Sequence, residues 1–157
     1  MNVGDIAPDF TLKNQFSQDI SLKDIDQNVL LLFFPFAFSS VCTSEMCNVR
    51  DNLKRYTDLN AKVLGISVDS HYTLKAWAEH LNINFDLLSD FNKVVSKLYN
   101  SFEEAFYPSK YNYLGVSKRS AVIVGRDKKI KYFKVCTEPD EEPNYDEIKN
   151  VLESLHD

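Results

Sequence analysis

Six apolar residues stand in succession at Val29–Phe34, and Pro35 follows them at once. A short, uninterrupted apolar run is typical of a strand that is buried on both faces of a sheet. Between residues 41 and 59 the apolar side chains recur every three or four positions, which predicts a helix. A doubly buried strand followed by an amphipathic helix predicts an α/β fold with a central sheet covered on both faces.

The periodicity elsewhere agrees with this fold class. Residues 9–22 predict two short edge strands, residues 62–68 a second buried strand, and residues 120–124 with 129–136 a hairpin. Two further helices are expected from their apolar stripes: Leu74, Trp77, Ala78 and Leu81 in one, and Ile148, Val151, Leu152 and Leu155 in the other. Residues 91–99 predict a short helix. We therefore expect a mixed sheet in a single domain of residues 1–157.

Composition excludes several classes of partner. A net charge of −5 disfavours nucleic acid and anionic lipid, and no apolar run approaches the roughly 20 residues that a membrane span needs. The N-terminal residues lack a signal-peptide pattern. Three cysteines are too few for a disulfide scaffold, and the three histidines show no metal-ligand spacing with them. We expect a cytoplasmic protein without a metal.

Cys42 occupies the first turn of the predicted helix, beyond the carboxyl end of the buried strand. Unpaired backbone N–H groups and the helix dipole favour a thiolate there, so Cys42 is a candidate nucleophile. It begins the core-facing stripe and should be partly exposed. Cys47 lies on the polar side of the same helix. Five residues span roughly 7.5 Å along a regular helix, so a disulfide between Cys42 and Cys47 requires the helix to unwind.

The spacing of Pro35, Ser39 and Cys42 resembles the active-site signature of the peroxiredoxins, although serine stands where threonine is commoner. Three further stretches resemble the opening segment of that family, its mid-chain strand and the strand that bears its arginine: residues 3–12, 85–90 and 119–124. Cys47 stands where the bacterioferritin-comigratory-protein subgroup often keeps its resolving cysteine. The resemblance implies a thioredoxin-like fold with an N-terminal β extension.

It also implies a thiol-dependent peroxidase that acts on hydrogen peroxide and organic hydroperoxides. Cys42 would become a sulfenic acid, Arg119 and Ser39 would assist the reaction, Pro35 would shield the site, and Glu45 would orient Arg119. Cys47 would capture the sulfenic acid as a disulfide, which a thioredoxin-type or other thiol reductant would then reduce. No cofactor is required, and the resemblance is compatible with a monomer or a homodimer.

Some readings stay open at this point. Phe36, Phe38 and Tyr107, with Phe33 and Phe34, either form an apolar entrance for organic hydroperoxides or simply fill the core. Cys136 has no assigned role and is expected to be structural. Two other functions also use Cys42 and Cys47. One is thiol–disulfide exchange on protein substrates, and the other is a non-enzymatic redox sensor or holdase.

Overall fold

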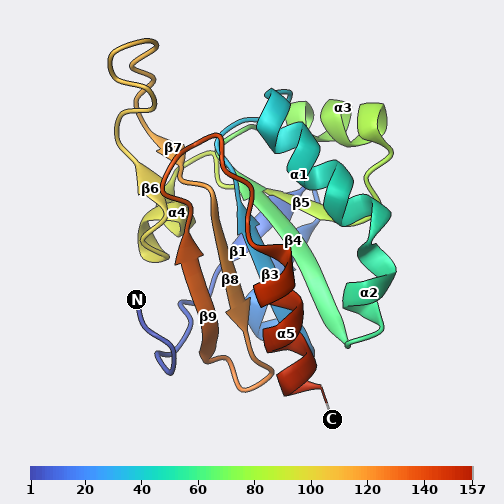
Figure 1. The fold of residues 1–157 in the computed structure, drawn as a ribbon. Helices are drawn as coiled ribbons and strands as arrows, with labels where there is room; N and C mark the ends of the chain where they lie inside the picture. Colours follow the sequence, from blue (N-terminus) through green and yellow to red (C-terminus); the bar gives the residue numbers. More distant parts are fainter. Residues whose placement is uncertain (157) are drawn as a thin grey trace.

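The computed structural model describes residues 1–156, and within them a seven-stranded mixed sheet runs through the molecule (Figure 1). Its order is β2-β1-β5-β4-β3-β8-β9. The central strands are parallel: β3 (Asn28–Phe33), β4 (Ala61–Ser67) and β5 (Asp86–Ser89). The outer strands pair antiparallel: β8 (Ser120–Val124), β9 (Ile130–Val135), β1 (Thr11–Asn14) and β2 (Asp19–Ser21). The predicted thioredoxin-like α/β class and its N-terminal β extension are confirmed.

Two apolar cores flank the sheet, because both faces of β3 are buried. Leu30, Leu32 and Phe34 face a core shared with helices α1 (Ser40–Asp51), α2 (Leu53–Thr57), α3 (His71–Leu81) and α5 (Tyr145–Leu155). The alternating residues Val29, Leu31 and Phe33 face a second core, covered by α4 (Val94–Leu98), the 3₁₀ turn η1 (Leu22–Asp24) and the N-terminal segment. This two-sided burial explains the uninterrupted apolar run.

The helix expected over residues 41–59 is in fact two helices, divided at Asn52. The Asn52 side chain donates a hydrogen bond to the Asn48 carbonyl at 2.8 Å, and its backbone leaves the helical region (φ −114°, ψ 15°). Asparagine side chains compete for backbone groups in this way and end helices. The predicted buried stripe nevertheless holds across the break, since Cys42, Met46, Val49 and Tyr56 are all inaccessible.

Two other boundaries differ from expectation. Helix α4 begins only at Val94, because the Asp90 carboxylate accepts hydrogen bonds from the backbone N–H groups of Val95 and Ser96. Of residues 9–22, only β2 forms an edge, since β1 also pairs with β5. The closing helix α5 is capped by Asn144, whose side chain accepts a hydrogen bond from the Glu147 N–H at 3.1 Å.

One short hairpin was not predicted. Strands β6 (Phe102–Glu103) and β7 (Val116–Ser117) pair antiparallel, and residues 104–115 between them project from the body of the molecule (Figure 1, yellow to orange). The two strands are each two residues long, which is too short for a periodic pattern. Within residues 1–156, none of the helices has the length and apolar character needed to cross a membrane.

Candidate active site

Cys42 is the third residue of α1, and the loop of residues 34–39 connects it to the carboxyl end of β3. Sites for ligands in open α/β sheets commonly lie at this edge. The side chain is fully buried in the core beneath α1, whereas the sequence predicted partial exposure. The prediction underestimated burial because it considered only the helix, and not the residues that cover its first turn from other elements.

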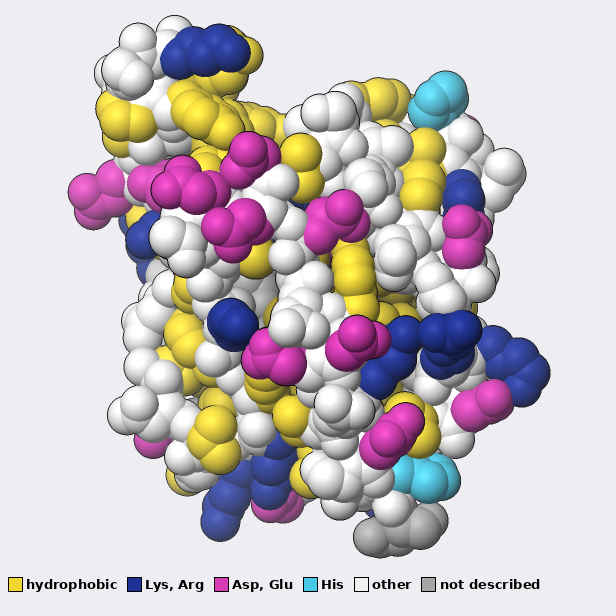
Figure 2. Space-filling model, in the orientation of Figure 1, with side chains coloured by type: hydrophobic (Ala, Val, Ile, Leu, Met, Phe, Trp, Pro, Cys, Tyr) yellow, Lys and Arg dark blue, Asp and Glu magenta, His cyan; other side chains and the backbone are white. Residues whose placement is uncertain are grey.

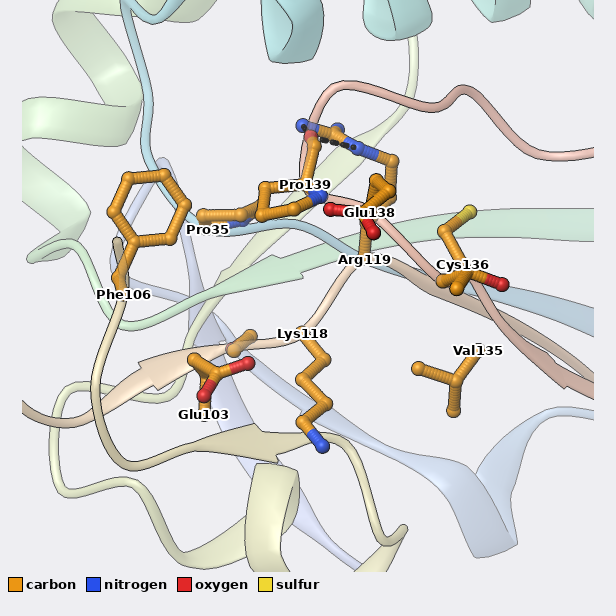
Figure 3. Close-up of a pocket in the computed structure, with 11 residues that line it drawn as sticks. Pro35, Glu103, Phe106, Lys118, Arg119, Val135, Cys136, Glu138 and Pro139 are labelled. Carbon is orange, nitrogen blue, oxygen red and sulfur yellow. Dashed lines mark hydrogen bonds between the residues drawn. The ribbon is translucent and has the colours of Figure 1, made fainter. Parts of the chain in front are cut away.

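Arg119 lies directly before β8, which pairs with β3, so it emerges beside Cys42. One terminal guanidinium nitrogen donates to the Cys42 Sγ at 3.2 Å, and the other donates to Glu45 Oε1 at 2.6 Å. The Pro139 carbonyl accepts two further bonds from the same guanidinium, at 3.0 and 3.3 Å (dashed in Figure 3). A guanidinium held by three partners presents its donors in a fixed direction. The expected contacts of Cys42, Glu45 and Arg119 are all present in the structure.

Glu45 is the buried counter-charge of this arginine. Burial raises the pKa of Glu45 to about 7, although the nearby Arg119 acts to lower it. Burial also acts to lower the pKa of Arg119, but the Glu45 carboxylate and the Cys42 sulfur outweigh this effect and raise it overall. The second Glu45 oxygen, Oε2, is buried without a hydrogen-bond partner in the described part of the chain.

The raised pKa of Glu45 predicts a pH-dependent stability. Between its ordinary value of 4.5 and about 7, the folded protein binds the proton that the unfolded chain has released, so stability falls as pH rises. We expect this contribution to be of order 3 kcal/mol. Glu45→Gln should remove this pH dependence. The unfolding free energy of the variant minus that of the wild type should therefore increase from pH 4.5 to 7. Denaturant titrations across this range measure the difference.

The exposed Glu153 on α5 offers a matched control. Glu153→Gln makes the same chemical change on the surface, so its stability difference from the wild type should stay nearly constant over the same pH range. A Glu45→Gln variant with an equally flat difference would contradict the raised pKa.

The Ser39 side chain closes the loop and makes no hydrogen bond to the Cys42 sulfur within residues 1–156. The Ser39 hydroxyl donates to the Phe36 carbonyl at 2.9 Å, closing the turn between β3 and α1. Phe38 within that turn has a left-handed backbone (φ 70°), which is uncommon for a bulky residue. Pro35 is buried, and it lines the cavities on either side of Arg119. The shielding role of Pro35 stays a prediction, while a direct hydrogen bond between Ser39 and Cys42 is not present in the described residues.

An aromatic cavity of about 520 Å³ opens on one side of Arg119. It is lined by Pro35, Ser39, Arg119 and Pro139 at one end and by aromatic side chains from two segments: Phe36, Phe38, Phe106, Tyr107, Tyr111 and Tyr113. Figure 2 shows hydrophobic side chains gathered on the projecting segment at the upper left. Both alternatives for the phenylalanines therefore hold, each for different residues. Phe33 and Phe34 fill the cores, whereas Phe36 and Phe38 line the cavity.

Phe106, Tyr111 and Tyr113 were not predicted as site residues. They meet Phe36 only through tertiary structure, with ring centroids of Phe106 and Tyr113 at 5.2 and 5.8 Å from that of Phe36. The tyrosine spacing of residues 107–113 was the one available signal, but nothing local showed that this segment turns toward the loop after β3.

Cys47 is half-buried and packs partly against the core, although the sequence placed it on the polar side of the helix. Its sulfur and that of Cys42 are both free thiols. Helix α1 is continuous between them, so a disulfide still requires unwinding. Within residues 1–156, no cluster of three or more His, Cys, Asp or Glu side chains is arranged to hold a metal ion.

Comparison with known proteins gives a consistent result. The profile of the AhpC/TSA family matches residues 3–133. Alkyl hydroperoxide reductase E of Mycobacterium tuberculosis (strain ATCC 25618 / H37Rv) is 37% identical over 136 residues, which is 84% of each chain. Peroxiredoxin Bcp of Escherichia coli (strain K12) is 35% identical over 133 residues, again 84% of each chain. Among solved structures, peroxidoxin BcpB from Mycobacterium tuberculosis superposes with a TM-score of 0.87 at 26% identity, covering 100% of this chain and 99% of the other.

Proposed function

The chain belongs to the AhpC/TSA family and is a thiol peroxidase, and from that membership we propose that Cys42 is the thiol that the peroxide oxidises. The observation that carries this assignment is the 3.2 Å contact between Arg119 and the Cys42 sulfur, inside a buried pair with Glu45. Of the three cysteines, Cys42 alone receives a hydrogen bond from a charged side chain in the described residues. A charge-assisted bond of this kind favours the thiolate, which is the nucleophilic form.

The reaction is a displacement at oxygen. The Cys42 thiolate attacks one peroxide oxygen, a sulfur–oxygen bond forms, and the oxygen–oxygen bond breaks. The other oxygen leaves with developing negative charge, which the guanidinium of Arg119 stabilises with donors already held in place. Glu45 and the Pro139 carbonyl fix that guanidinium, and Pro35 excludes water beside it. The departing oxygen takes up one proton from solvent, equal to the one that the Cys42 thiol released on ionising. The products are water or an alcohol and a sulfenic acid on Cys42.

The substrates we propose are hydrogen peroxide and organic hydroperoxides. The aromatic cavity supports the second class, because Arg119, beside which the peroxide group would have to lie, lines it together with the aromatic side chains. An apolar substituent would bury its surface against Phe36 and Phe106, while hydrogen peroxide needs no such contact. One relative carries the name alkyl hydroperoxide reductase, which agrees with this assignment.

We assign Cys47 the role of resolving thiol, which requires the start of α1 to open. Two features make this turn easy to unwind. The Ser39 hydroxyl contacts the Phe36 carbonyl and does not cap the helix, and α1 has no acidic residue in its first turn to complement the dipole. Unwinding would bring the Cys42 sulfenic acid and the Cys47 thiol within bonding distance, and water would leave as the disulfide forms.

Cys47→Ser tests this cycle. The first equivalent of hydrogen peroxide should be consumed as fast as in the wild type, because Cys42 and Arg119 are untouched. Steady-state turnover with a thioredoxin-type reductant should fall by about tenfold or more, because the resolving thiol is lost. Stopped-flow oxidation, trapping of the sulfenic acid with dimedone, and peptide mass spectrometry measure these steps. In the wild type we expect a Cys42–Cys47 disulfide.

Asn48→Ser is the matched control, because it changes the next residue on α1 and its side chain makes no hydrogen bond in the described structure. It should cycle at nearly the wild-type rate. Full turnover in Cys47→Ser would show that Cys47 is dispensable. The proposal also includes a thioredoxin-type reductant, a cytoplasmic location and a monomeric or dimeric state. The cytoplasmic location rests on the cysteine count, since three cysteines are too few for a disulfide scaffold.

A further inference from the structure

A third cysteine lies directly beside the proposed site. In the β8–β9 hairpin, Ser120 pairs with Val135. One residue further along, Arg119 lies opposite Cys136, and the Cys136 N–H donates to the Arg119 carbonyl at 2.8 Å. Residues directly opposite each other in a hairpin project toward the same face. Figure 3 shows this, because the side chains of Arg119 and Cys136 rise to one side of the sheet while Lys118 and Val135 lie on the other.

The chain after Cys136 then crosses the guanidinium. We call residues 136–139 the strap. The Pro139 carbonyl at the end of the strap accepts a bond of 3.0 Å from the same Arg119 nitrogen that donates to the Cys42 sulfur at 3.2 Å. One nitrogen atom therefore joins the strap to the oxidisable sulfur. Cys136, at the other end of this strap, belongs to the same small region.

Space for movement surrounds the Cys136 side chain. It lines a cavity of about 270 Å³ next to Arg119 and another of about 370 Å³ beneath residues 141–144. The side chain is only half-buried. A thiol that is walled on two sides by cavities can change rotamer without displacing core residues.

Arg119 also holds a buried carboxylate, that of Glu45. Glu45 Oε2 is fully buried and makes no hydrogen bond within residues 1–156. Burial and then the Glu45 charge raise the pKa of Cys136 to about 11. An unpartnered buried carboxylate oxygen is costly, and such a group calls for a function.

We propose that Cys136 is a second resolving thiol, which condenses with the Cys42 sulfenic acid when Cys47 does not. A bond forms between the two sulfurs, and the sulfur–oxygen bond of Cys42 breaks. The Cys136 proton passes to the departing hydroxide, which leaves as water. The sulfenic sulfur is reduced and the thiol oxidised, so no other oxidant is needed. This inference rests on the proposed oxidation of Cys42.

The geometry makes this a slow route. Cys136 is held as a thiol by its surroundings, so it reacts less readily than an exposed cysteine. The first turn of α1 must also open, as it must for Cys47. Cys136 would therefore trap a sulfenic acid that has lasted too long, before a second peroxide oxidises it irreversibly.

The experiment uses Cys47→Ser and Cys47→Ser/Cys136→Ser in the full chain. Each reduced protein receives one equivalent of hydrogen peroxide, and samples taken over time are treated with dimedone and alkylated for peptide mass spectrometry. In Cys47→Ser the dimedone-reactive form should decay while an intramolecular Cys42–Cys136 disulfide appears. In the double variant the sulfenic acid should last longer by about tenfold or more. Cys47→Ser/Thr137→Ser, which alters the strap but keeps the thiol, should behave like Cys47→Ser.

The outcomes separate this inference from the proposed function. Equal sulfenic acid lifetimes in the two variants would overturn the role of Cys136 and leave Cys42 as the oxidised thiol. A Cys42–Cys136 bond that joins two chains, seen as doubled mass on a non-reducing gel, would overturn it as well. Absence of any Cys42 oxidation would overturn the proposed function itself. The disulfide in Cys47→Ser is read without altering Cys136, so the test does not depend on how that replacement folds.

Discussion

Replacing Cys42 by serine is expected to abolish peroxidase activity, with kcat/KM lower by about 10⁴-fold or more. A serine hydroxyl is almost never ionised at neutral pH, so the site would retain Arg119 and Glu45 but lose its nucleophile. The substitution is nearly isosteric in a fully buried position, and the fold should be preserved. Peroxide consumption measured with a thiol reductant, beside a far-ultraviolet circular dichroism spectrum, tests both statements.

The matched control is Cys47→Ser, which makes the same chemical change five residues along the same helix. It should keep the fast oxidation of the first equivalent of peroxide, whereas Cys42→Ser should lose it. If the Cys42→Ser protein still consumed peroxide at the wild-type rate, the assignment of the oxidised thiol would be wrong.

Arg119→Ala is expected to lower kcat/KM by about 10²- to 10³-fold, because donors aimed at the departing oxygen are lost. It should also destabilise the protein by about 1–3 kcal/mol, because the pKa of Glu45 rises further without Arg119 and Glu45 stays buried as a protonated carboxyl that has lost its partner. Arg119→Lys should recover little activity. A lysine carries all its donors on one nitrogen, so it lacks the planar fork with which Arg119 reaches Cys42, Glu45 and the Pro139 carbonyl from separate nitrogens.

Arg126→Ala is the control for general loss of positive charge, because Arg126 lies on the surface and pairs with the exposed Asp26. Its activity and its unfolding free energy should both stay near wild type. A rate of Cys42 oxidation that Arg119→Ala leaves unchanged would remove Arg119 from the chemistry, whatever the effect on stability.

The parts of the fold that a local pattern determines could be predicted from the sequence. The apolar run at residues 29–34 predicts a doubly buried strand, and helix periodicity places Cys42 on the buried face of its helix. The division at Asn52 could not be foreseen from apolar spacing, because a polar side chain that bonds the Asn48 carbonyl ends the helix there. The apolar stripe continues across the break and conceals it.

In the site, too, only the features that a local sequence pattern determines could be predicted. Cys42 was predicted from its place at the helix start, and Glu45 and Arg119 from the resemblance to the peroxiredoxins; the structure brings the three side chains into contact. The nearness of Cys136 to Arg119 depends on the register of the β8–β9 hairpin, which the sequence of the turn alone does not specify. Ser39 likewise bonds a backbone carbonyl rather than the thiol, since the turn leaves that carbonyl within its reach.

The projecting hairpin separates the residues that would bind an apolar substituent from the residues that would react with the peroxide. The atoms that would react with the peroxide lie on the sheet and α1, while much of the aromatic wall comes from residues 104–115, whose two ends meet at the β6–β7 pair. A loop that leaves and rejoins the body at one point can lengthen, shorten or change sequence without disturbing the sheet. Changes in residues 104–115 can therefore alter which hydroperoxides the enzyme accepts, while Cys42, Glu45 and Arg119 stay as they are.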